Sequence, residues 1–266
     1  MTPLRIALFQ GPAGVPATPA QSLAALDRAA RRAAAGGARL LVTPELSLTG
    51  YAIGAAVPEL AETADGPAAG AVARIAAAHR VGIVYGYPER SGCGVHNSVQ
   101  LIGPDGSRLA GYRKTHLYGT FETTYFTPGD ELVVQAEFDG LRVGLLICYD
   151  VEFPETVRAH ALAGTELLLV PTALMRPYEF VAHTLLPARA WENQLHLAYV
   201  NRCGPEGDFD FAGLSCLAGP DGTVRARAGA GEELLLAEVD PALLLSSRAA
   251  NPHLRDRRPG LYGPLA

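Results

Sequence analysis

Two Gly-Pro-Asp-Gly segments, at residues 103–106 and 219–222, constrain the fold of this chain more than any other feature. Each separates two strand-like runs, so each is predicted to be the turn of a β-hairpin. Before each hairpin, apolar runs of strand length alternate with helix-like segments, which is typical of β-α-β crossover units. Because crossover units followed by a hairpin occur twice, we expect two sheets related by an internal pseudo-twofold axis.

The first half of the chain contains two crossover units. Strands are predicted at residues 4–10, 38–42 and 81–87, since each is a short apolar run bounded by Gly, Pro or polar residues. The Ala-rich segments between them are predicted to be helices, because a proline stands in the first turn of each and a glycine follows the last. The predicted fold class is therefore α/β.

The second half repeats this pattern with more interruptions. Aromatic residues around Phe121 and Phe126 predict a loop that walls a pocket. A helix is predicted after Pro154, and a longer one over residues 178–195 is expected to kink or break at Pro187. Strands are predicted at residues 132–138, 141–148, 166–170, 197–200, 211–218 and 223–227.

Composition limits the partners and surroundings of the protein. Its 266 residues are 48% hydrophobic and 18% charged, and we expect one domain spanning residues 1–266. The net charge of -5 predicts no basic surface for nucleic acid or anionic lipid. The sequence has neither the charged region followed by an apolar segment that is typical of a signal peptide nor an apolar run long enough for a membrane span. A cytoplasmic location is therefore expected.

The cysteines have neither the spacing of zinc ligands nor that of a disulfide framework. All four thiols are therefore expected to be reduced. They are Cys93, Cys148, Cys203 and Cys216.

Three reactive side chains stand where predicted strands end. Cys148 follows an apolar run and precedes a helix that starts at Pro154, so it lies on a strand-to-helix elbow, where a helix dipole favours a thiolate. Glu45 and Lys114 follow two other strands. The ends of parallel strands lie on one side of a sheet, so the three side chains are expected to converge. Together they are a nucleophile, a carboxylate base and a cation for an oxyanion.

Each of these residues also has an unreactive interpretation. A single cysteine is often a small buried hydrophobe, a loop glutamate is usually exposed, and a lysine commonly extends to solvent. A cysteine–histidine pair formed by Cys148 and His116 is an alternative site, and spacing alone does not exclude it.

The segments around these residues resemble motifs of the nitrilase superfamily of carbon-nitrogen hydrolases. They read Thr-Pro-Glu-Leu-Ser-Leu-Thr-Gly-Tyr at 43–51, Tyr-Arg-Lys-Thr-His-Leu at 112–117 and Cys-Tyr-Asp-Val-Glu-Phe-Pro-Glu at 148–155. The resemblance implies a four-layer αββα sandwich and a Glu-Lys-Cys triad. In that triad Glu45 is the base, Lys114 the oxyanion cation and Cys148 the nucleophile.

The resemblance implies further features of the site and of its assembly. Glu122 would position the substrate and brace the lysine, with a surface glutamate as the alternative at this position. The triad needs neither a metal nor another cofactor. A homodimer, or a multiple of one, is expected to form through the helical layers. Residues of about 250–266 would form a tail that lies across the partner, and a solvent-exposed tail is the alternative.

Within the superfamily the chain is similar to amidases that act on 5-aminopentanamide, although Leu174 stands where those enzymes have asparagine. The expected reaction is hydrolysis of a small primary aliphatic amide, including an ω-amino amide, to the acid and ammonia through a cysteine thioester. Nitrilase and N-carbamoyl amine amidohydrolase activities are the alternatives within the superfamily. A catalytically silent small-molecule binding protein is the alternative outside it.

An aromatic-lined slot is expected to hold this substrate. The residues expected to bind it are Tyr51, Tyr118, Tyr149, Phe153 and Thr172, with Phe121 and Phe126 adding to the wall. Three acidic residues are available to a substrate ammonium group: Asp150, Glu152 and Glu179. An arginine that could bind a substrate carboxylate is absent between Cys148 and Arg158.

Overall fold

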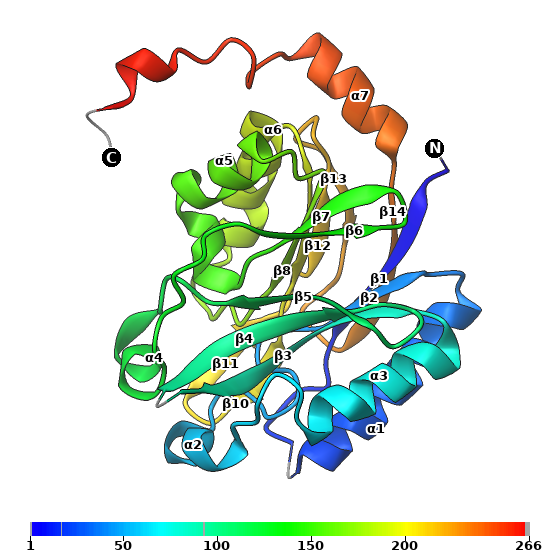
Figure 1. Ribbon diagram of the computed structural model, residues 1–266, viewed down its shortest axis with the longest axis vertical. Coiled ribbons are helices and arrows are strands. Elements are labelled where there is room, and N and C mark those ends of the chain that lie inside the picture. The colour runs from blue at the N-terminus through cyan, green and yellow to red at the C-terminus, as the bar shows by residue number, and fades with distance from the viewer. Residues whose placement is uncertain (1, 17, 93, 264–266) are drawn as a thin grey trace.

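Two six-stranded sheets form the centre of the computed structural model, which describes residues 2–16, 18–92 and 94–263 (Figure 1). The first sheet has the order β14(Glu233–Val239), β1(Leu4–Gln10), β2(Leu40–Val42), β3(Gly82–Ser91), β4(Gly94–Ile102), β5(Arg108–Arg113). The second has the order β13(Val224–Arg227), β12(Cys216–Ala218), β9(His196–Val200), β8(Leu167–Pro171), β7(Leu141–Leu145), β6(Val134–Phe138). A separate two-stranded ribbon consists of β10(Cys203–Glu206) and β11(Phe209–Ala212).

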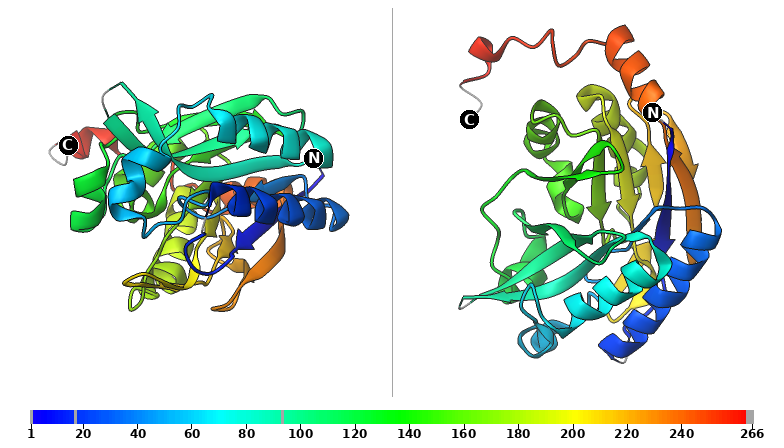
Figure 2. Two further views of the ribbon diagram at one scale, coloured as in Figure 1. Left: turned by 90° about the horizontal axis from the view of Figure 1, so that it is seen from below. Right: turned by 45° about the vertical axis from the view of Figure 1, so that its right-hand side comes forward.

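Helices cover the outer faces of the two sheets, so the layers follow the expected αββα order (Figures 1 and 2). The first sheet carries α1(Pro19–Ala35) and α3(Pro67–His79), and the second carries α5(Pro154–Leu162) and α6(Leu186–Asn193). The remaining helices are α2(Val57–Leu60), α4(Gly119–Tyr125) and α7(Pro241–Ala250). Short 3₁₀ turns span Gly54–Ala56, Cys148–Glu152 and Pro259–Leu261, and a π-helical turn spans Val181–Leu185.

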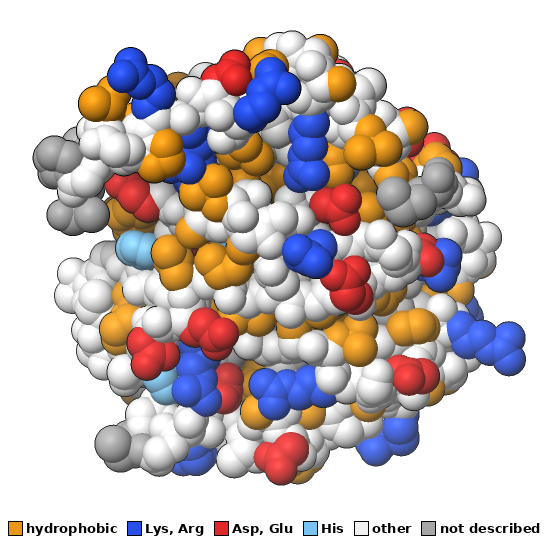
Figure 3. Space-filling view, turned by 45° about the horizontal axis from the view of Figure 1, so that its top comes forward, with side chains coloured by type: hydrophobic (Ala, Val, Ile, Leu, Met, Phe, Trp, Pro, Cys, Tyr) orange, Lys and Arg blue, Asp and Glu red, His pale blue; other side chains and the backbone are white. Residues whose placement is uncertain are grey.

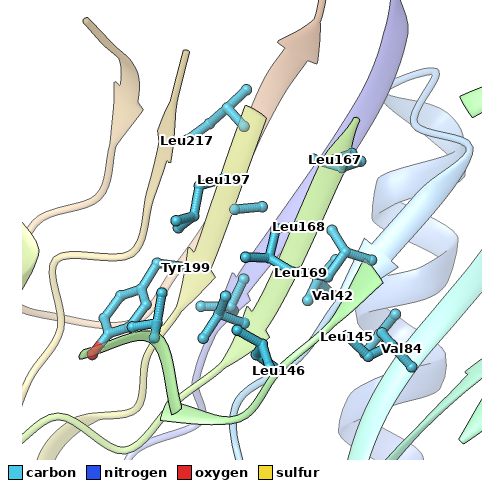
Figure 4. Close-up of a cluster of buried hydrophobic side chains, with 14 of the residues drawn as sticks. Val42, Val84, Leu145, Leu146, Leu167, Leu168, Leu169, Leu197, Tyr199 and Leu217 are labelled. Atoms are coloured by element: carbon cyan, nitrogen blue, oxygen red, sulfur yellow. The ribbon is translucent and has the colours of Figure 1, made fainter. Parts of the chain in front are cut away.

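The main hydrophobic core lies between the sheets and is built by strand alternation. In β1, Leu4, Ile6 and Leu8 belong to the core cluster shared by both sheets. Ala7 points to the opposite face and packs in the cluster that includes α1 and α3. Figure 4 shows the inner cluster, in which Val42 of the first sheet and Leu169 of the second are both fully buried.

The internal pseudo-twofold predicted from the repeated hairpins is confirmed by the strand pairing. In the first sheet β1, β2 and β3 run parallel, and β4 returns antiparallel to β3. In the second sheet β7, β8 and β9 run parallel, and β12 returns antiparallel to β9. The turns at residues 103–106 and 219–222 join β4 to β5 and β12 to β13. Each sheet therefore presents the carboxyl ends of three parallel strands.

Several local predictions were wrong. The aromatic segment around Phe121 forms α4 and not a loop. Pro187 lies in the first turn of α6, where its missing N–H costs nothing, so it follows a π-helical turn instead of breaking a long helix. The predicted strand at 211–218 is divided between β11 and β12, because residues 213–215 leave the ladder. β14 and α7 were not predicted.

Charges of both signs are interspersed over the face seen in Figure 3. Within residues 2–16, 18–92 and 94–263, no helix is long and apolar enough to cross a membrane. Cys148, Cys203 and Cys216 are free thiols, as expected. The prediction for Cys93 concerns a residue outside the described part of the chain.

Candidate active site

Glu45 is held on a turn that leaves β2 and packs against β3. Its N–H donates to the Thr172 carbonyl oxygen at 3.3 Å, and the Arg202 guanidinium donates to the Glu45 carbonyl oxygen at 3.2 Å. A Cβ atom on Gly86 would lie 2.5 Å from the Leu46 nitrogen, so only glycine allows β3 to approach this turn. The Glu45 side chain is fully buried.

A buried lysine joins two buried carboxylates at the end of β5. The Lys114 ammonium donates to Glu45 Oε1 and to Glu122 Oε1, each at 2.6 Å, and all three side chains have no exposed surface. Glu122 also accepts from the Tyr51 hydroxyl at 2.8 Å and from the Tyr118 N–H at 2.8 Å. Glu122 is therefore a bracing group in the interior, and the surface alternative does not describe its position.

Glu45 keeps one carboxylate oxygen free for chemistry. Its Oε1 accepts from Lys114 and from the Asn97 amide at 2.6 Å, whereas no hydrogen-bond donor from the described residues reaches its buried Oε2. Burial, opposed by the nearby Lys114 charge, raises the pKa of Glu45 to about 7. A carboxyl group with this pKa can accept and return a proton near neutral pH.

Cys148 begins a 3₁₀ turn directly after the apolar run that contains β7. Its backbone has a φ of 47°, a left-handed conformation that is uncommon for a non-glycine residue, and its side chain is almost fully buried. Burial opposes the dipole-stabilised thiolate that was expected here. Burial and the Glu45 charge raise the pKa of the thiol well above its usual range, although Lys114 opposes them.

Asp150 fixes the turn that carries Cys148. One of its oxygens accepts from the Ile147 N–H at 3.1 Å and from the Tyr112 hydroxyl at 2.8 Å. The other accepts from the His116 N–H at 2.9 Å. Because this fully buried carboxylate is occupied by these donors, Asp150 does not serve as a free anion for a substrate ammonium group.

His116 lies beside Asp150 and Phe153, and its side chain is partly exposed. Its ring contacts Asp150 and Thr115 through Nδ1, each at 2.9 Å, and stacks on Phe153 with ring centroids 4.0 Å apart. The charges of Glu45, Lys114 and Glu122 all act on the Cys148 thiol. His116 is thus engaged with Asp150, Thr115 and Phe153, whereas Glu45 and Lys114 belong to the buried cluster that acts on Cys148.

A cavity of about 260 Å³ opens onto Cys148. Tyr118 and Tyr149, both expected to contact the substrate, belong to its wall. The other residues of the wall are Glu152, Ala173, Leu174, Met175, Tyr178 and Val181. Most of this wall is apolar. Leu174 adds a hydrocarbon side chain at the position where the similar enzymes have asparagine.

Three residues expected to bind the substrate lie outside this wall. Tyr51 is buried behind Glu122 and stacks on Phe121, with ring centroids 5.3 Å apart. Phe153 packs on His116, and the Thr172 hydroxyl donates to the Val170 carbonyl oxygen at 3.2 Å. Their role in substrate binding therefore stays a prediction.

Two wall residues that sequence analysis missed, Ala173 and Met175, lie on either side of Leu174 after the end of β8. Ala173, Leu174 and Met175 closely follow that strand, and β8 is parallel to and paired with β7, the strand before Cys148. The strand-end rule that selected Cys148 would have selected them too. Leu174 is fixed because its N–H donates to the Asn201 side chain at 2.7 Å.

Comparison with known proteins identifies the family. The family model for carbon-nitrogen hydrolases matches residues 5–249. The "Hydrolase in pqqF 5'region" of Pseudomonas protegens is 49% identical over 99% of this chain and 92% of its own length. An "(R)-stereoselective amidase" from a Pseudomonas species is 40% identical over 86% of this chain and 83% of its own length.

A solved structure has the same fold. It is a double mutant of the amidase from Nesterenkonia sp. AN1, with a glutamate replaced by glutamine and a cysteine by alanine, in complex with acrylamide. It superposes with a TM-score of 0.90 at 37% identity, over 99% of this chain and 97% of the other.

The chain therefore belongs to the carbon-nitrogen hydrolase family. It is an amidase of the nitrilase superfamily, which sets aside the silent binding protein as an interpretation.

Proposed function

We propose that this amidase hydrolyses small primary aliphatic amides, including ω-amino amides such as 5-aminopentanamide, with Cys148 as nucleophile. One observation carries the proposal: a small, mostly apolar cavity ends at a thiol whose charge environment is set by Glu45, Lys114 and Glu122. The Nesterenkonia amidase supports the choice of substrate class, since its structure contains acrylamide, itself a small primary amide.

Acylation begins with proton transfer from the thiol to Glu45. The free Oε2 of Glu45 accepts the Cys148 proton as the sulfur attacks the amide carbonyl carbon. Lys114 and the Tyr149 backbone N–H stabilise the oxyanion that forms, a contribution of about 3 to 4 kcal/mol for one such donor. Glu45 then returns its proton to the leaving ammonia as the carbon–nitrogen bond breaks, which leaves a thioester on Cys148.

Deacylation uses the same residues, with water in place of the thiol as the proton donor to Glu45. Glu45 takes a proton from water, the hydroxide oxygen attacks the thioester carbon, and the Cys148 sulfur leaves and regains that proton. Glu122 keeps Lys114 charged and fixed throughout, because its Oε1 accepts the lysine ammonium and its Oε2 accepts the Tyr118 N–H. Neither half-reaction requires a group that the chain lacks.

The size and lining of the cavity set the substrate class. A volume of about 260 Å³ is below the range typical of sites for drug-sized ligands, so a short chain fits better than a peptide. Leu174, Met175 and Val181 offer hydrocarbon to an aliphatic chain. Such a wall favours an amide with a few methylene groups.

A substrate panel tests this function. We expect the protein to release ammonia from pentanamide and 5-aminopentanamide with higher kcat/KM than from the matching nitriles or N-carbamoyl amines. The physical reasons are that a nitrile offers no ammonia leaving group at the first addition, and that the apolar wall formed by Leu174, Met175 and Val181 disfavours the polar N–H of a carbamoyl amine. If a nitrile or a carbamoyl amine exceeded every amide in kcat/KM, the choice of substrate class would be wrong.

Assembly as a homodimer is a second part of the proposal. Leu261 and Tyr262 of the tail remain 60% and 38% exposed, and Leu162 on α5 remains 52% exposed, so these apolar side chains are available to a second copy. We expect light scattering to give twice the chain mass of 28.0 kDa, or a multiple of that. A monomer at micromolar concentration would contradict this expectation.

A further inference from the structure

Glu152 is the one acidic side chain among the described residues of the cavity wall. It is half-buried, and no described donor hydrogen-bonds to its carboxylate. By contrast, both oxygens of Asp150 accept hydrogen bonds in the interior, and Glu179 is paired with Arg176 at 2.8 Å. Of the three acids considered for a substrate ammonium group, only Glu152 combines a free carboxylate with a place in the cavity.

The backbone of this residue is fixed from behind. Arg189 donates from Nε to the Val151 carbonyl oxygen at 3.1 Å and from a terminal nitrogen to the Glu152 carbonyl oxygen at 2.8 Å. Its other terminal nitrogen is paired with Glu192 at 2.8 Å. Arg189 therefore positions the turn without neutralising the Glu152 carboxylate by a direct ion pair.

The surroundings of Glu152 suit a cation. Tyr118, Tyr149 and Tyr178 share the cavity wall with it, and the Tyr118 hydroxyl hydrogen-bonds to Tyr178. Aromatic faces attract ammonium groups, and a partly desolvated carboxylate gains more from a cation than an exposed one does. Burial raises the pKa of Glu152, although the charges of Lys114 and Arg189 oppose this shift.

The separation of Glu152 from Cys148 suits a substrate that carries an amide at one end and an ammonium group at the other. Glu152 lies four residues after Cys148 in one 3₁₀ turn, which corresponds to roughly 8 Å between their Cα atoms. An amide at Cys148 and an ammonium group at Glu152 therefore need a linker of several methylenes.

We propose that Glu152 is a specificity-determining residue that binds the ammonium group of an ω-amino amide while the amide lies at Cys148. The proposal rests on the amidase function proposed above. The three tyrosines enclose the ammonium group, and Leu174 and Met175 contact the methylene chain. Glu152 takes no part in bond making or breaking, so its removal should affect charged substrates selectively.

The test compares two substrates in two matched variants. Glu152→Gln keeps the shape of the side chain and removes its charge. Glu155→Gln is the control, because it makes the same charge change three residues away, at an exposed position of α5 outside the cavity. For each protein, kcat/KM is measured by ammonia release from 5-aminopentanamide and from pentanamide, which differ only in the terminal amine.

We expect Glu152→Gln to lower kcat/KM for 5-aminopentanamide about tenfold to hundredfold, the size of a lost charged hydrogen bond. Pentanamide should change by less than about twofold, and Glu155→Gln should resemble the unmodified protein with both substrates. Equal losses for both substrates in Glu152→Gln would overturn the proposal, since they would indicate a role in the fold or at the amide. An unmodified protein that does not favour the amino amide would overturn it as well.

A binding measurement separates this proposal from the proposed function. In Cys148→Ala, which cannot turn over substrate, calorimetry should give tighter binding of 5-aminopentanamide than of pentanamide, and adding Glu152→Gln should remove that difference. If no amide is hydrolysed by the unmodified protein, the proposed substrate class fails. If amides are hydrolysed but the binding difference survives Glu152→Gln, only the role of Glu152 fails.

Discussion

Replacement of Cys148 by alanine is expected to lower kcat for amide hydrolysis by at least about 10⁴-fold, because the other groups of the site cannot form the covalent intermediate. The fold should be retained, since the side chain loses only its sulfur at the floor of a solvent-accessible cavity. The measurement is ammonia release from pentanamide, with thermal unfolding as the check on the fold.

Cys216→Ala is the matched control for this change. Cys216 is a fully buried thiol in β12, outside the cavity, and burial raises its pKa to about 11. Its replacement should cost stability through a small void and leave kcat within about twofold. Hydrolysis by Cys148→Ala at the rate of the unmodified protein would remove Cys148 from the mechanism.

Replacement of Glu45 by glutamine is expected to lower kcat/KM about 10²- to 10⁴-fold, the usual contribution of a general base. Glutamine can still accept hydrogen bonds from Lys114 and Asn97 through its carbonyl oxygen, so the loss would come from the missing proton acceptor. Glu89→Gln is the control, because Glu89 is also buried and ion-paired, but with Arg113. It should lose stability and retain kcat.

The pH dependence provides a second measurement on Glu45. Burial raises its pKa to about 7, and the reactive form is the deprotonated one. The value of kcat/KM should therefore rise with pH through about 7 and fall about tenfold per pH unit below that point. Glu45→Gln should have no such limb. A limb that survives unchanged in Glu45→Gln would assign it to another group.

The fold could be predicted from sequence because the order of strands and turns is written in short local patterns, and the convergence of the candidate site residues was expected from the same strand ends. The carboxyl ends of parallel strands lie along the same edge of a sheet. Glu45, Lys114 and Cys148 were therefore expected to converge without any knowledge of loop conformation. The repeated turns at residues 103–106 and 219–222 likewise defined two similar sheets. The strand runs and the Gly-Pro-Asp-Gly turns are both local in sequence, and the turn occurs once in each half of the chain.

The cavity wall could not be predicted as well, because it depends on side-chain direction within irregular turns. Tyr51 and Tyr118 are equally aromatic, yet Tyr51 lies behind Glu122 whereas Tyr118, at the start of α4, faces the cavity. The environment of the Cys148 thiol was incompletely predicted for a related reason. A dipole argument considers one helix end, whereas burial beside Glu45 and Glu122 acts on the whole cluster.

The central claim is that the acyl group passes through Cys148, and mass spectrometry of acid-quenched Glu45→Gln protein incubated with pentanamide tests it most directly. Loss of Glu45 should slow thioester hydrolysis as well as thioester formation, so an acyl-enzyme that forms during a long incubation with excess pentanamide should persist until the quench. We predict a mass gain of one pentanoyl group, located on the peptide that contains Cys148 and absent when Cys148 is also replaced by alanine. An acyl group on another residue, or continued ammonia release from protein that stays unmodified, would contradict the account.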